Sequence, residues 1–74
     1  MNLENKFFAI YKNHGIILFF DDQIERDTFV EEEWCVYPDI KAVEYDDIKE
    51  LIKDREPEFD KSFDSWVFDI RVAV

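Results

Sequence analysis

Glycine, cysteine and histidine each occur only once in this 74-residue chain, and there are only two prolines. A loop that wraps phosphate groups is excluded, because it needs several glycines within a short span. The single cysteine, Cys35, excludes a disulfide within the chain and predicts a reducing compartment, the cytoplasm. Because Cys35 stands between Trp34 and Val36, we expect its thiol to be buried and inert.

Groups that could perform chemistry are equally scarce. The histidine, His14, falls in a predicted hairpin turn, and Cys35 has no plausible histidine partner to activate it. The pairs Asp21–Asp22 and Asp46–Asp47 could bind a divalent ion or exchange protons, but both stand at predicted helix starts, where capping explains them. No loop has the ligand spacing and central glycine of a calcium site. We therefore predict no enzymatic activity, no metal site and no cofactor.

Long apolar runs are also missing. The longest is Ile16–Phe20, which is far too short to cross a membrane. No basic segment followed by an apolar run marks a secretory signal peptide. Since 74 residues correspond to one domain, we expect residues 1–74 to form a single soluble acidic domain.

The hydrophobic pattern predicts the element order ββαβαβ. Expected strands span residues 6–12, 16–20, 40–45 and 66–74, and expected helices span residues 22–34 and 47–55. Gly15 lies where the first hairpin needs a positive φ, and residues 56–65 form a charged loop. We therefore expect an α+β fold, a mostly antiparallel sheet with two helices on one face.

The charge is strongly negative and unevenly distributed. Nineteen acidic and nine basic residues give a net charge of −10. Residues 1–20 contain one acid and two bases, whereas residues 21–74 contain eighteen acids and seven bases. Such a field repels nucleic acid and anionic lipid, and it attracts basic surfaces. We therefore predict a basic nucleic-acid-binding protein as the partner, and neither direct nucleic-acid contact nor membrane contact.

The acids concentrate on the two predicted helices. Asp21, Glu25 and Glu32 share one face of the first helix, and the glutamates at residues 31–33 oppose the helix dipole at its end. Trp34 is the expected exposed aromatic anchor. The predicted partner-binding residues are Asp21, Asp22, Glu25, Asp27, Glu31, Glu32, Glu33, Trp34, Asp46, Asp47, Glu50 and Asp54. If both helices cover one face of the sheet, these carboxylates form one acidic surface.

Rows of carboxylates on helices can reproduce the spaced negative charge of a nucleic-acid backbone. In size, in charge and in these acid rows, the chain resembles the small acidic phage proteins that act as DNA mimics. This resemblance implies an inhibitor used in host takeover, in the cytoplasm of a bacterial host. Such inhibitors occupy the nucleic-acid groove of a restriction enzyme, a repair glycosylase, a nucleoid protein or a CRISPR effector.

Other functions fit the same composition. An immunity protein against a nuclease toxin would use the same electrostatic attraction. A small phage or bacterial adaptor, structural or regulatory, would use its acids only for solubility. One continuous acidic face favours the inhibitor, whereas acids on all sides favour the adaptor. Pairing of two copies through a sheet edge is a further alternative.

Overall fold

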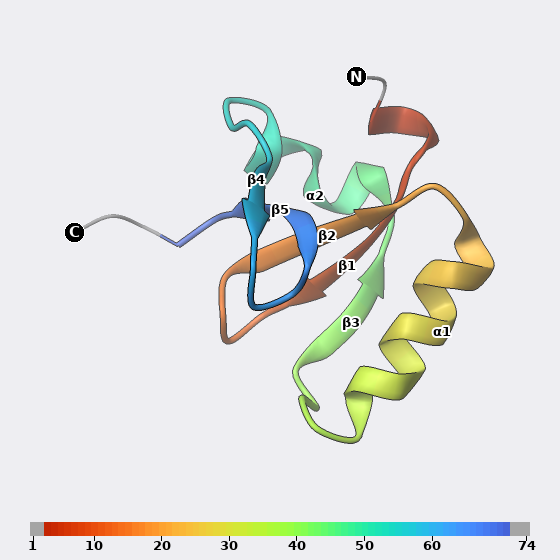
Figure 1. The fold of residues 1–74 in the computed structure, drawn as a ribbon. Helices are drawn as coiled ribbons and strands as arrows, with labels where there is room; N and C mark the ends of the chain where they lie inside the picture. Colours follow the sequence, from red (N-terminus) through yellow and green to blue (C-terminus); the bar gives the residue numbers. More distant parts are fainter. Residues whose placement is uncertain (1–2, 72–74) are drawn as a thin grey trace.

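The computed structural model describes residues 3–71 and shows in them one antiparallel sheet with a helix on each face (Figure 1). The elements are a 3₁₀ helix Leu3–Asn5, strands β1 Phe7–Tyr11, β2 Ile16–Phe20, β3 Ile40–Val43, β4 Glu58–Asp60 and β5 Ser65–Asp69, and helices α1 Gln23–Trp34 and α2 Tyr45–Ile52. The sheet order is β3-β1-β2-β5-β4, so β3 and β4 are its edges. The α+β class and the antiparallel sheet are confirmed.

The first hairpin forms as the sequence predicts. Its register runs from Phe7 opposite Phe20 to Tyr11 opposite Ile16. Gly15 has a φ of 64°, which a residue without a side chain adopts at little cost. A Cβ atom there would also lie 2.6 Å from the Arg71 Cγ atom. The turn therefore needs glycine both for its backbone conformation and for this close approach.

The central strands bury both of their faces. One cluster consists of Phe8, Ile10, Ile17 and Phe68 with Ile48 and Ile52 of α2. The other consists of Ala9, Tyr11, Ile16, Leu18, Ile40 and Val67, against which Phe29 and Val30 of α1 pack. Because successive residues of a strand point to opposite faces, α1 and α2 cover opposite faces of the sheet. The prediction of two helices on one face is therefore wrong: β1 and β2 are apolar at every position, so each face needs a cover.

The charged segment predicted as a loop contains a further strand. β4 pairs with β5, with Phe59 opposite Trp66, so the observed order is ββαβαββ. The turn between them includes Asp64 with a φ of 51°, a left-handed conformation in which aspartate is enriched. The last strand ends at Asp69, earlier than predicted, and residues 72–74 of its predicted span lie outside the described residues.

The second helix starts two residues before its predicted first residue. α2 begins at Tyr45, and Glu44 rather than Asp46 occupies the N-cap position. The Glu44 amide donates a hydrogen bond of 3.0 Å to the Asp47 carboxylate. Asp47 thus binds the backbone at the helix start, where a carboxylate is stabilised by the helix dipole.

The end of β5 contains a pH-dependent contact. The Asp69 carboxylate accepts hydrogen bonds from the side chain and the amide of Arg71, and these lower the pKa of Asp69 to about 2. A carboxyl with a lowered folded-state pKa stabilises the fold above its unfolded-state pKa of about 3.9, and this stabilisation is lost as the pH falls through the folded-state pKa. We expect Asp69→Asn to lower the Tm slightly at pH 7, since the pair is partly exposed, and to have a smaller effect near pH 2, where the folded-state carboxyl is about half protonated. Thermal unfolding of the variant and the original chain at both pH values measures the change in Tm. An equal fall in Tm at both pH values would contradict the expected role of Asp69.

Candidate protein-binding surface

A buried arginine fastens α1 to the sheet. Arg26 is only 3% exposed, and its guanidinium donates hydrogen bonds of 3.1 Å to the carbonyl oxygens of Phe8 and Val43. It also lies 3.6 Å from a carboxylate oxygen of Glu44. These contacts join α1 to β1 and to the end of β3. A buried cation is tolerated because it is paired and hydrogen-bonded.

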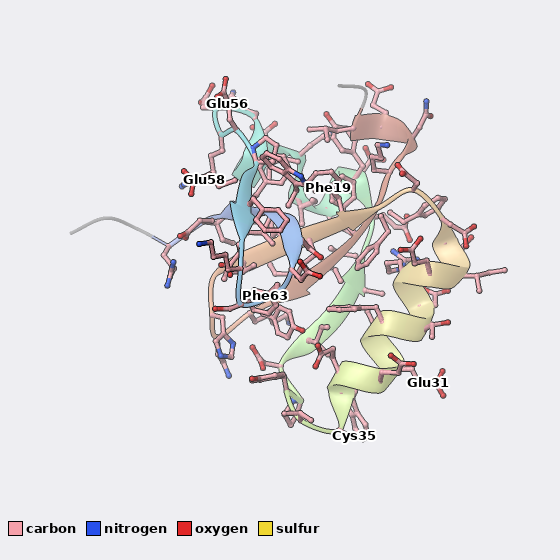
Figure 2. The ribbon with its side chains drawn as sticks, viewed as in Figure 1. Phe19, Glu31, Cys35, Glu56, Glu58 and Phe63 are labelled. Carbon is pink, nitrogen blue, oxygen red and sulfur yellow. The ribbon has the colours of Figure 1, made fainter. Side chains whose placement is uncertain are left out.

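The burial of Arg26 leaves the outward side of α1 acidic. Residues 21–34 contain seven acids, and Arg26 is their only base. The exposed acids are Asp21, Asp22, Glu25, Asp27, Glu31 and Glu32, while Glu33 is partly buried. Three of them have local partners. Asp22 caps the helix by accepting from the Glu25 amide at 3.1 Å, Asp21 pairs with Lys6, and Asp27 accepts from the Arg26 Nε atom at 2.6 Å. Figure 2 shows Glu31 projecting from α1 on the side away from β4.

The end of α1 has an unfavourable charge distribution for a helix. Three glutamates occupy residues 31–33, and the last turn has no basic residue. Carboxylates at a helix C-terminus repel the partial negative charge of the helix dipole. Among the described residues, Glu31 and Glu32 make no hydrogen bond or ion pair within the chain. Their placement thus weakens the helix with no compensating contact in the fold.

The acids of α2 form a separate set on the opposite face of the sheet. They are Asp46, Asp47 and Glu50, together with Asp54, which follows the helix because α2 ends at Ile52 and not at the predicted Arg55; all four are exposed. Residues 45–55 contain four acids and three bases, and Lys49 and Lys53 lie 3.5 and 3.7 Å from the carboxylates of Asp46 and Glu50. The surface of α2 is therefore close to neutral. The predicted single acidic surface across both helices is wrong, because the helices cover opposite faces.

Further acids lie at the other edge of the sheet. Figure 2 shows Glu56 and Glu58 beside β4, across the molecule from Glu31. Acidic side chains are thus distributed over several sides, and only α1 combines many acids with a lack of exposed bases in its own segment.

The flank of α1 that faces β3 forms a shallow recess. Its volume is about 230 Å³, and its lining residues are Asp27, Val30, Glu31, Trp34 and Ala42; we call it the α1–β3 groove. The floor is apolar, and the two carboxylates stand at its rim. Figure 1 shows α1 running alongside β3, which has no further strand beyond it.

Two side chains at the end of α1 are exposed. Trp34 is 60% exposed, as its predicted anchoring role requires, and that role stays a prediction. Cys35 is also exposed, so the expectation of a buried thiol is wrong. Cys35 occupies the C-cap position of α1, where the chain leaves the helix, and its apolar neighbours Trp34 and Val36 are themselves exposed.

Sequence reasoning missed the residues that orient this surface. Arg26, Phe29, Val30 and Glu33 have i, i+3, i+4 and i+7 spacing and form the inner side of α1. That spacing was a usable signal, but a base and an acid within an apolar stripe disguised it. Ala42 gave no signal, because its importance depends on β3 being an edge strand.

The remaining polar groups include the single histidine of the chain. His14 is in the hairpin turn, and its Nδ1 atom lies 3.2 Å from the Asp39 carboxylate. Within residues 3–71, no group of three histidine, cysteine, aspartate or glutamate side chains is placed to hold a metal ion. The part of the chain that the structure describes has no helix with the length and apolar character needed to cross a membrane.

Comparison of the chain with models of protein families, with curated protein sequences and with solved structures finds no significant match.

Proposed function

We propose that this chain is an acidic binding protein of the bacterial cytoplasm, which holds a basic nucleic-acid-binding protein against the outward side of α1. By occupying the groove for nucleic acid, it inhibits that protein. The observation that carries this proposal is the burial of Arg26. Within α1, that base pairs only with Asp27, so the other exposed acids of the helix face a partner with no cation from their own segment to neutralise them.

The arrangement of the acids supports this mode of binding. Glu25 and Glu32 are seven residues apart, and Asp27 and Glu31 are four residues apart, so each pair follows one side of the helix. Rows of negative charge on a rigid rod suit a groove that normally binds a phosphate backbone. Glu31 and Glu32 in the last turn also support a role outside the fold, since they oppose the helix dipole and make no hydrogen bond or ion pair within the described residues.

Charge reversal on α1 is expected to weaken binding of the partner by about tenfold or more, because attraction between the basic groove and this helix is lost. The variant is Glu25→Lys with Glu32→Lys. The matched control is Asp46→Lys with Glu50→Lys on α2, which changes the net charge equally and should alter affinity by less than about threefold. The partner is isolated by passing a bacterial lysate over immobilised chain and eluting with short duplex DNA. Affinities are then measured by titration at two salt concentrations.

Competition provides the decisive control. Duplex DNA and the chain should exclude each other from the partner, and affinity should fall as salt rises because exposed charges are screened over about 8 Å at physiological ionic strength. Simultaneous binding of chain and duplex would overturn the inhibitor function. Equal losses for the α1 and α2 variants would show that net charge, and not this helix, governs binding.

A second function, that of a small adaptor, is favoured by one observation. Acids occur on α1, on α2 and beside β4, which is the distributed pattern expected when acids serve solubility. An adaptor would bind through apolar groups such as Trp34, Phe59 or Trp66, which are 60%, 49% and 56% exposed. Its binding would be insensitive to salt and to duplex DNA, so the same titrations separate the two functions.

A further inference from the structure

The outer edge of β3 presents unpaired backbone groups. The Lys12 amide donates to the Asp39 carbonyl at 3.4 Å, and β3 continues antiparallel to β1 with Lys41 opposite Ile10. In an antiparallel pair, hydrogen-bonded positions alternate. Lys41 therefore directs its amide and carbonyl toward β1, and Ala42 directs its own amide and carbonyl away from the sheet.

The open part of this edge is short. The amide of Ile40 is bonded to the Tyr37 carbonyl at 3.0 Å, and the amide of Glu44 is bonded to the Asp47 carboxylate at 3.0 Å. The groups left for an incoming strand are the amide and carbonyl of Ala42 and the carbonyl of Ile40. Such an edge can pair with a few residues of an extended segment.

The α1–β3 groove adjoins this open edge on the face that α1 covers. Ala42 is opposite Ala9, which belongs to the cluster beneath α1, so the methyl group of Ala42 points to the same side as the helix. The floor of the groove suits the aliphatic stem of a lysine or arginine, and the carboxylates of Asp27 and Glu31 suit its charged end. Asp27 accepts from the Arg26 Nε atom through Oδ1 at 2.6 Å, but its side chain is half exposed, which leaves Oδ2 for the partner. Trp34 adds an exposed aromatic face of the kind that attracts cations.

The spacing of the two rim carboxylates also matches a strand. Asp27 and Glu31 are four residues apart on α1, which is about 6 Å along the helix axis. Alternate residues of a β-strand are about 6.6 Å apart and point to the same face. Two basic side chains at positions i and i+2 of an added strand would therefore meet Asp27 and Glu31 in register.

We propose that the α1–β3 groove binds an extended basic segment of the partner protein, which adds a strand to the edge at Ala42 and places lysine or arginine side chains against Asp27 and Glu31. A second copy of this chain is disfavoured there, because pairing β3 with β3 would bring two acidic rims together on chains that each carry a charge of −10. The inference deepens the proposed function by naming the form of the contact, and it rests on that function only for the partner's identity.

The test uses the whole chain and a synthetic probe. The probe is a capped peptide of five residues in which threonine and arginine alternate, with arginines at the second and fourth positions. Its comparison peptide carries methyl groups on the interior amide nitrogens, which keeps the charge and removes the backbone donors. NMR titration at low salt should give a Kd below about 1 mM for the first peptide, with a large shift of the Ala42 amide signal. Methylation should weaken binding by about tenfold, since the strand hydrogen bonds are lost.

Matched variants test the carboxylates. Asp27→Asn with Glu31→Gln should weaken binding of the unmodified peptide by about tenfold, whereas Asp46→Asn with Glu50→Gln, an equal change of charge on α2, should alter it by less than about threefold. If the methylated peptide binds equally well and the Ala42 amide signal does not move, strand addition is overturned, while electrostatic binding by α1 can stand. Absence of any peptide binding also overturns it. Peptide binding as expected, with no partner that duplex DNA displaces, would instead refute the proposed inhibitor.

Discussion

Replacement of Arg26 by alanine is expected to lower the free energy of unfolding by about 3 kcal/mol. Its guanidinium donates to the carbonyl oxygens of Phe8 and Val43, and a hydrogen bond from a charged donor contributes roughly 1.5–3 kcal/mol. Loss of the buried stem adds a packing defect. In a domain of this size, the Tm should fall by roughly 12 °C or more. Denaturant unfolding followed by tryptophan fluorescence measures the change.

A second substitution at this position separates the two contributions. Arg26→Met retains most of the stem volume and removes all the donors, so a loss of about 2 kcal/mol is expected from the hydrogen bonds alone. Arg26→Ala should lower the free energy of unfolding further than Arg26→Met does, by the cost of the cavity that alanine leaves. If the free energies of unfolding of both variants lie within about 0.5 kcal/mol of that of the original chain, Arg26 does not hold α1 to the sheet. The acidity of the outward surface would then need another explanation.

Replacement of Tyr11 by alanine is expected to lower the free energy of unfolding by about 4 kcal/mol, a typical loss when a large buried aromatic residue is replaced by alanine. Tyr11 is fully buried and lies at the centre of an aromatic cluster beneath α1. Its ring centroid is 5.0 Å from that of Phe63, 5.6 Å from that of Tyr37 and 6.5 Å from that of Phe29. The loss should appear as a lower midpoint of denaturant unfolding.

Tyr11→Phe is the matched control, and its expected effect has the opposite sign or is close to zero. Burial raises the pKa of the Tyr11 hydroxyl, and the negative charge of Glu33 raises it further. The hydroxyl nevertheless makes no hydrogen bond of ordinary geometry within the described chain. Its removal therefore eliminates the cost of burying an unsatisfied polar group, which is roughly 1 kcal/mol. A clear loss of stability in Tyr11→Phe would instead show that the hydroxyl bonds to Glu33 in solution.

The sequence predicted the elements better than their arrangement. The hairpin, the first helix and its Asp22 cap follow from local signals: an apolar run on each side of Gly15, and a carboxylate before the helix. The strand β4 was missed, because two of its three residues Glu58–Asp60 are charged and its apolar residue, Phe59, contacts Trp66 of β5 only once the two strands have paired. The start of α2 was misplaced, because Asp46 is of a preferred N-cap type and Glu44, which occupies that position, is not.

The layer arrangement was predictable from a signal already present. The segment Ile16–Phe20 is apolar at every position, and a sheet that is apolar on both faces needs cover on both. The candidate site depended more strongly on three-dimensional contacts. The inward position of Arg26 depends on carbonyl oxygens of β1 and β3, which no local pattern reveals. The groove beside Ala42 exists only because β3 has one neighbour.

The division of α1 into an inner and an outer side has a consequence for how this protein can change over generations. Arg26, Phe29 and Val30 meet the sheet, so drift at these positions is opposed by selection for folding. Glu31 and Glu32 have no contact on which the fold depends, so they can be exchanged with little effect on stability. The outward surface of α1 can therefore change its chemistry while the scaffold beneath it stays the same.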